Sequence, residues 1–134
     1  MVNLIQLKKF WKNKKVFITG HTGFKGAWLC IFMNLLGAKV YGYSLPPKKK
    51  SLFNQAKCKK FLKKNIYANI QNYNLLKNQI VKIRPEIIFH LAAQSLVSKS
   101  FENPLETFNT NIIGTTNILN LVKHKKSIKS VVII

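Results

Sequence analysis

The chain has 134 residues, enough for one domain of the commonest size. Apolar residues make up 47% of it, which supports a packed core and excludes a disordered chain. Its 23 lysines and arginines against 3 acidic residues give a net charge of +20, a field that attracts polyanions without regard to their sequence.

The basic residues do not form the pattern of a nucleic-acid reader. Arg84 is the only arginine, and the lysines are spread over every segment without interleaved aromatic residues. We therefore expect a lysine-rich surface and no specific nucleic-acid partner. No apolar stretch reaches the roughly 18 residues of a membrane span, and the N-terminus lacks the apolar region of a secretory signal. Cys30 and Cys58 have no metal-ligand spacing, so no metal site is expected, and the sequence predicts a cytoplasmic protein.

The first third of the chain reads as helix, strand, helix and strand. Apolar spacing predicts a short helix around residues 4–11, and "KKVFIT" predicts a strand over 14–19. Residues 25–36 are apolar nearly all round, which predicts a helix buried against a sheet. Gly37 stands where a left-handed helix cap belongs, and a second strand is expected over 38–45.

The remaining segments continue the alternation. The loop that follows the second strand carries dense lysines and about one helical turn. Beyond it we expect a third strand over 66–70, a helix over 73–84, a fourth strand over 86–93, a long helix that starts at Pro104, and a fifth strand over 130–134. Strands that alternate with helices predict an α/β fold, a parallel sheet with right-handed crossovers and helices on both faces.

One short motif carries most of the functional interpretation. Residues 19–26 read "TGHTGFKG", directly after the first strand and at the start of a helix. In such a turn Gly20 permits the tight bend, Gly23 lets the backbone approach a pyrophosphate, and Gly26 lets the helix pack on the strand. The N–H groups of the helix start then face the phosphates. The sequence therefore predicts a dinucleotide-binding loop.

The motif, spaced GxxGxxG, resembles the extended short-chain dehydrogenase/reductase superfamily. "HLAAQ" (90–94) and "NTNIIGT" (109–115) resemble two further segments of that superfamily. The longer stretches 10–29 and 84–97, with "GYSLPP" and "SLF", resemble its nucleotide-sugar 4,6-dehydratases that act on CDP-glucose. The resemblance implies a Rossmann-type doubly wound parallel sheet, incomplete at its C-terminal side, in which residues 1–134 form the N-terminal part of the dinucleotide-binding domain.

The resemblance also implies site residues and a cofactor. NAD would be the cofactor, CDP-glucose the substrate of the full enzyme, and a homodimer its assembly. Asn111 matches a position that is more often architectural than catalytic. The cofactor-binding residues carried over are Gly20, Thr22, Gly23, Phe24, Lys25, Gly26, Ser44, Asn69, Ile70, Leu91, Ala92, Ala93, Gln94 and Thr110.

Two stretches of the sequence depart from the family pattern. Asn69 stands where an aspartate usually contacts adenine, although an amide oxygen can still accept from the adenine amino group. The second strand ends in Tyr43 and Ser44, where many relatives carry an acid for the ribose hydroxyls, and Lys48 to Lys50 follow. Lysines suit a 2′-phosphate by charge, whereas the "GYSL" segment resembles the NAD-using dehydratases. The resemblance therefore favours NAD over NADP.

No catalytic residue is predicted in this chain. The family's base is a Tyr-x-x-x-Lys pair that should follow the fifth strand, and the C-terminal catalytic and sugar-binding part is expected to be absent. Tyr73 and Lys77 have that spacing, but they come too early and are interpreted as a chance match. Three hypotheses stay open: the NAD-binding part of a dehydratase, a non-catalytic remnant of a related epimerase or reductase, and a basic nucleic-acid-binding domain.

Overall fold

Five parallel strands form a single sheet in the computed structural model, which describes residues 3–134. The strand order is β3-β2-β1-β4-β5, and every neighbouring pair is parallel. The strands are β1 (Lys15–Thr19), β2 (Lys39–Ser44), β3 (Leu62–Tyr67), β4 (Ile87–His90) and β5 (Ser130–Ile133). The order places β1 in the centre and reverses direction between β1 and β4. This confirms the predicted Rossmann-type α/β fold.

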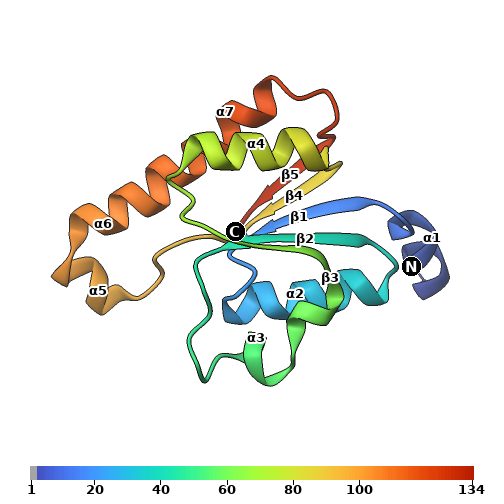
Figure 1. The fold of residues 1–134 in the computed structure, drawn as a ribbon, viewed down its shortest axis with the longest axis horizontal. Coiled ribbons are helices and arrows are strands. Elements are labelled where there is room, and N and C mark those ends of the chain that lie inside the picture. The colour runs from blue at the N-terminus through green and yellow to red at the C-terminus, as the bar shows by residue number, and fades with distance from the viewer. Residues whose placement is uncertain (1–2) are drawn as a thin grey trace.

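Helices lie on both faces of the sheet (Figure 1). On one face lies α2 with the short α3 and η1, and on the other lie α4 and α7. The segment α5–α6 extends beyond the ends of the strands, and α1 lies near the opposite ends. The helices are α1 (Leu4–Trp11), α2 (Phe24–Leu35), α3 (Leu52–Gln55), η1 (Cys58–Phe61), α4 (Tyr73–Ile83), α5 (Val97–Glu102), α6 (Pro104–Phe108), η2 (Asn109–Ile113) and α7 (Gly114–Lys123).

The central strand β1 is buried on both faces. Val16 and Ile18 pack with Cys30 of α2, whereas Phe17 packs on the opposite side with residues of α4 and α7 such as Ile118. Alternation of side chains along a strand produces this division. A parallel sheet covered by helices on both faces needs such a continuous apolar strand.

Several predicted boundaries are wrong. The third strand covers residues 62–67 and not 66–70. The prediction failed because Lys63 and Lys64 interrupt the apolar pattern, whereas an edge strand can pair with β2 without apolar side chains. The fourth strand ends at His90, so residues 91–93 are loop. Residues 97–102 form a helix that the sequence did not suggest. The long helix from Pro104 is confirmed as a helical run to Lys123, with the π-helix η2 inside it.

The helix after the glycine loop packs against the sheet as predicted, but only one of its apolar faces is buried. Ala27, Cys30 and Met33 face the sheet, but Trp28 is 54% exposed and Phe32 50% exposed. Phe24 and Leu35 are exposed as well, so an apolar stripe runs along the outer face of α2. No helix among residues 3–134 is long and apolar enough to cross a membrane.

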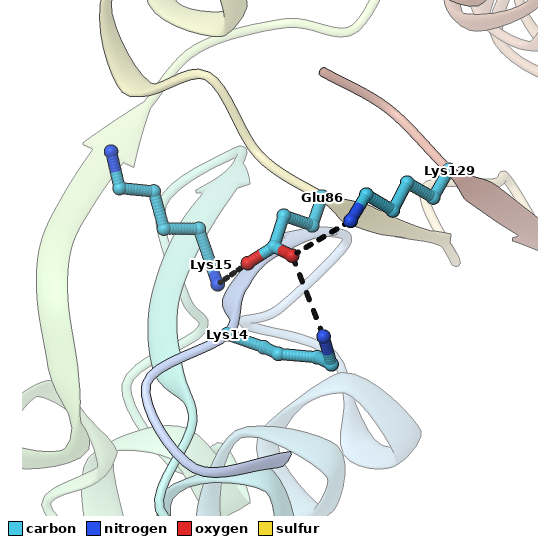
Figure 2. A network of polar contacts seen from close by, with 4 residues as sticks. All are labelled: Lys14, Lys15, Glu86 and Lys129. Carbon is cyan, nitrogen blue, oxygen red and sulfur yellow. Dashed lines mark hydrogen bonds and ion pairs between the residues drawn. The ribbon is translucent and has the colours of Figure 1, made fainter. Parts of the chain in front are cut away.

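Glu86 ties the amino ends of three strands together (Figure 2). Its carboxylate lies 3.5 Å from Nζ of Lys14 and 3.7 Å from Nζ of Lys129, and it accepts the backbone N–H of Lys15 at 3.4 Å. Burial alone would raise the pKa of Glu86, but the Lys15 N–H and the charges of Lys14 and Lys129 together lower it. These ends lie opposite the carboxyl ends of the strands, where this topology places ligands.

Candidate dinucleotide-binding site

A cavity of about 530 Å³ opens at the carboxyl ends of the central strands. It lies where β1, β2 and β4 meet, which is the ligand position of open α/β sheets. Its wall contains every predicted cofactor-binding residue except Gln94. Those that line it are Gly20, Thr22, Gly23, Phe24, Lys25, Gly26, Ser44, Asn69, Ile70, Leu91, Ala92, Ala93 and Thr110.

The glycine loop is shaped for close approach of backbone to backbone. Gly20 has φ +71°, and a Cβ there would lie 2.6 Å from the carbonyl group of Leu91. A Cβ on Gly26 would overlap the carbonyl oxygen of Gly20, so the start of α2 can rest on the strand end only without a side chain. The roles predicted for Gly20 and Gly26 follow directly from this packing.

Gly23 is the N-cap residue of α2, and no side chain caps the helix there. The N–H groups of the first helical turn have no partner within their own helix, and they end at the cavity wall formed by Gly23, Phe24 and Lys25. A helix start of this kind attracts anions, and Lys25 adds a positive charge. The arrangement therefore fits the diphosphate of a dinucleotide.

Hydroxyl groups line the part of the cavity next to β2. The Oγ1 atom of Thr22 lies 2.8 Å from Oγ of Ser44 and donates to the carbonyl oxygen of Leu45 at 2.9 Å. If Thr22 donates to Leu45, the Ser44 hydroxyl donates to Thr22. The pair therefore holds the glycine loop against the end of β2 by neutral hydrogen bonds.

Asn69 lines the cavity, but its side chain is turned toward its own loop. The side-chain Oδ1 of Asn69 accepts the backbone N–H of Gln71 at 2.9 Å. The backbone carbonyl oxygen of Asn69 accepts a hydrogen bond from the hydroxyl of Tyr43 at 3.1 Å. Only the second lone pair of Oδ1 remains for another donor. This local bond limits the adenine contact that the sequence suggested for Asn69.

The segment that follows β4 is held at both ends. The backbone N–H groups of Leu91 and Ala92 donate to Oγ1 of Thr19 at 3.2 Å. At the other end Asn111 accepts the N–H of Gln94 at 2.8 Å and donates to its carbonyl at 3.1 Å, which confirms an architectural contact for Asn111. The side chain of Gln94 turns to Leu96 and Thr107 and does not line the cavity.

His21 lies inside the protein and not in the cavity wall. Its Nε2 atom is 2.6 Å from Oδ1 of Asn65, and its ring covers Gly42, where a Cβ would lie 2.5 Å from the imidazole. Burial lowers the pKa of His21, against the opposing effects of Asn65 and the Tyr43 backbone. The structure therefore gives His21 a packing position beneath the loop.

Sequence reasoning missed five lining residues. Ala68, Ser95 and Ile134 were not among the residues carried over from the resemblance, and Leu45 was expected only as the last residue of the second strand. Glu106 stands in the first turn of α6 and also lines the cavity. Its place in the wall depends on the path of α5 and α6, which no local signal predicts. The five are Leu45, Ala68, Ser95, Glu106 and Ile134.

The Tyr73–Lys77 spacing has no part in this cavity. Tyr73 begins α4, and its hydroxyl accepts from Nδ2 of Asn120. Neither residue lines the cavity. Residues 3–134 also contain no group of three or more His, Cys, Asp or Glu that could hold a metal ion.

Comparison with known proteins agrees with this geometry. The sequence model of a family described as GDP-mannose 4,6 dehydratase matches residues 17–134. The chain belongs to this family.

Among curated members of related sequence, CDP-glucose 4,6-dehydratase of Salmonella typhimurium is 45% identical over 93% of this chain. The match covers 35% of that protein, so the chain spans about a third of the relative's length. It corresponds to the N-terminal third.

Solved structures share the fold. An epimerase from Methanothermobacter thermautotrophicus superimposes with a TM-score of 0.80 at 21% identity, over 97% of this chain and 37% of that one. UDP-glucose 4-epimerase from Brucella ovis, solved in complex with NAD, has a TM-score of 0.76 at 19% identity, over 90% of this chain and 35% of that one. At these identities the likeness establishes the fold of the family member and nothing finer.

Proposed function

We propose that this chain is the NAD(H)-binding part of a nucleotide-sugar 4,6-dehydratase acting on CDP-glucose. The observation that carries the proposal is the glycine loop, whose uncapped helix start forms one wall of the cavity. The similarity to the Salmonella typhimurium enzyme supports the choice of dehydratase and sugar nucleotide. When bound, the nicotinamide ring would accept and later return a hydride.

The chain's own residues would bind and orient the dinucleotide. The N–H groups at the start of α2, with Lys25, would hold the diphosphate. The hydroxyl pair of Thr22 and Ser44 would lie beside the adenosine ribose, and Ile70 would line its adenine side. Leu91 to Ala93 would run along the cofactor, and Thr110 would close the wall. No base for the sugar hydroxyl lies among these residues, so the proposed contribution is cofactor binding.

The outer face of the helical run from Pro104 supports a proposed dimer. Leu105, Phe108, Ile112 and Leu119 are all more than 45% exposed. A contiguous apolar helix face of this kind is typical of a protein–protein contact. We propose that a second copy packs there in the assembled enzyme. Placement in the cytoplasm remains a prediction of the sequence.

The cofactor proposal is tested by a Gly23→Val substitution. A Cβ at Gly23 would lie 3.3 Å from the Gly20 carbonyl oxygen, closer than an ordinary contact, so a side chain there requires a small shift of the loop. The branched methyl groups of valine would project from this exposed loop toward the proposed diphosphate position. We expect NAD affinity, measured by titration calorimetry, to fall by about a hundredfold or more, which is about 2.7 kcal/mol.

The matched control is Thr116→Val, which places the same side chain on the exposed face of α7, away from the cavity. Its NAD affinity should equal that of the unmodified chain. Equal NAD affinity in Gly23→Val and in the unmodified chain would show that the glycine loop is not the binding site.

A further inference from the structure

A buried histidine, a buried threonine and a half-buried threonine form a series of hydrogen bonds behind the cavity. His90, the last residue of β4, is 2% exposed. Its Nδ1 atom lies 2.7 Å from Oγ1 of Thr19, at the end of β1, and its Nε2 atom lies 3.0 Å from Oγ1 of Thr115 in α7. Thr115 in turn donates to the carbonyl oxygen of Asn111 at 2.7 Å. None of the four residues lines the cavity.

The donor and acceptor of each hydrogen bond in this series can be assigned. Oγ1 of Thr19 already accepts the N–H groups of Leu91 and Ala92, so its own hydrogen is free to go to His90. Nδ1 of His90 must then be an acceptor, and Nε2 must carry the hydrogen that goes to Thr115. Thr115 passes its hydrogen to Asn111. One assignment, with a neutral Nε2–H imidazole, satisfies every atom.

This series of hydrogen bonds joins the two residues that hold the ends of one short segment. Thr19 holds the start of residues 91–94, and Asn111 holds their end. His90 and Thr115 link these anchors across the interior of the protein. The segment packs tightly against the glycine loop, because a Cβ added to Gly20 would collide with the backbone of Leu91. A small displacement of the segment would therefore change the shape of the cavity wall.

We propose that His90, as its neutral Nε2–H tautomer, is a positioning residue that fixes residues 91–94 against the glycine loop through Thr19 and Thr115. The consequence for NAD rests on the proposed function, since it requires that this cavity bind the cofactor. A histidine suits the position because its two ring nitrogens can accept from one side and donate to the other. The effect on the cofactor is indirect, through the backbone of the segment.

The test removes the hydroxyl of Thr115, which touches neither the cavity nor any proposed ligand group. Thr115→Val keeps the shape and leaves the Nε2–H of His90 without an acceptor, whereas Thr115→Ser keeps the hydroxyl. We expect NAD affinity to fall about tenfold in Thr115→Val and to recover in Thr115→Ser. Ile88→Val is the control for general loosening, because Ile88 is fully buried in the same strand and lies outside the cavity wall. It should lose stability and keep its NAD affinity.

Two readouts need no cofactor. Nitrogen NMR of the unmodified chain should show His90 as the neutral Nε2–H tautomer. Amide hydrogen exchange at Leu91, Ala92 and Gln94 should be faster in Thr115→Val than in Thr115→Ser, with no such change in Ile88→Val.

Each outcome decides one of the two proposals. If the unmodified chain does not bind NAD, the proposed function fails, and the tautomer and exchange measurements still test the role of His90. An Nδ1–H tautomer, or unchanged exchange in Thr115→Val, would overturn the positioning role. So would NAD affinity in Thr115→Val equal to that of the unmodified chain.

Discussion

Single residues in this protein have their chemistry set by burial. His90 and His21 are both enclosed, and burial lowers the pKa of each, to about 4 in the case of His90. Neither ring lines the cavity, yet both lie directly behind the loops that form its wall. The histidines thus affect the site through the backbone they support.

Because of the buried histidines, we expect the folded protein to lose stability as the pH falls. Between pH 6.5 and about 4, the unfolded chain protonates His90 while the folded chain keeps it neutral. The unfolded state then binds more protons, so the free energy of unfolding rises with pH through this window. The contribution of neutral His90 to stability is complete above pH 6.5 and is lost as the pH falls toward 4. For His90 alone the loss on acidification amounts to at most roughly 3 kcal/mol. Urea denaturation at several pH values across the window measures it.

The variant His90→Gln separates this residue from the rest. It should be less stable than the unmodified chain near neutral pH, because the hydrogen bonds of the ring are disturbed, but its stability should depend less on pH. The lowered pKa of His21 leaves a residual dependence in the same direction. A flat profile for the unmodified chain between pH 5 and 7 would contradict the burial of a neutral histidine.

At the scale of elements, one carboxylate organises the amino ends of the central strands. Glu86 stands just before β4 and contacts residues just before or at the start of β1, together with Lys129 just before β5. In a chain with 3 acidic and 23 basic residues, this is the site where negative charge joins adjacent strands. Its contacts help to set the register that brings the opposite strand ends, and the cavity, together.

We expect Glu86→Gln to lower the free energy of unfolding by about 0.5 to 1 kcal/mol, the usual size for a partly exposed ion pair. Lys129 contributes little because its side chain is 71% exposed, so most of the loss comes from Lys14 and the Lys15 N–H. Chemical denaturation at low and high salt measures the change, which should shrink as salt screens the charges.

The control is Glu102→Gln, which makes the same charge change at an exposed residue that forms no ion pair within residues 3–134. Its stability should stay close to that of the unmodified chain. If the two variants lost the same amount, the effect would reflect net charge and not the contacts at the strand ends.

At the scale of the whole molecule, apolar and basic surfaces occur together. The outer faces of α2 and of the run from Pro104 are apolar, and Val132, Ile133 and Ile134 of the last strand region are exposed. A free strand edge with exposed apolar side chains favours association with other chains. The lysines counteract it through a net charge of +20, which keeps molecules apart at low salt.

The same charge predicts non-specific polyanion binding. Affinity for DNA should fall by about a hundredfold or more between about 50 and 200 mM salt, without preference between unrelated duplexes, since counterion release drives it. Fluorescence anisotropy with two duplexes of different sequence measures both properties. A preference of about a thousandfold for one sequence at physiological salt would instead favour the nucleic-acid-binding hypothesis.

The sequence by itself determined the alternation of the five strands with helices and the residues of the glycine loop. Alternating apolar patterns are local signals, so β1, α2 and α4 lie within a residue or two of their predicted bounds. Gly20 and Gly26 were recognisable because only glycine tolerates such close backbone contacts. The resemblance then supplied the lining residues on the other strands, and all but Gln94 reached the cavity.

Only the tertiary structure decided which polar side chains work together. Thr19 and His90 are 71 residues apart in the sequence, and His21 meets Asn65 across 44 residues, so no local pattern relates them. The exposed face of α2 likewise depends on which segments cover the helix, and the sequence does not mark these. Local patterns report the conformation of a segment, whereas hydrogen-bond partners and exposed faces are fixed when distant segments pack.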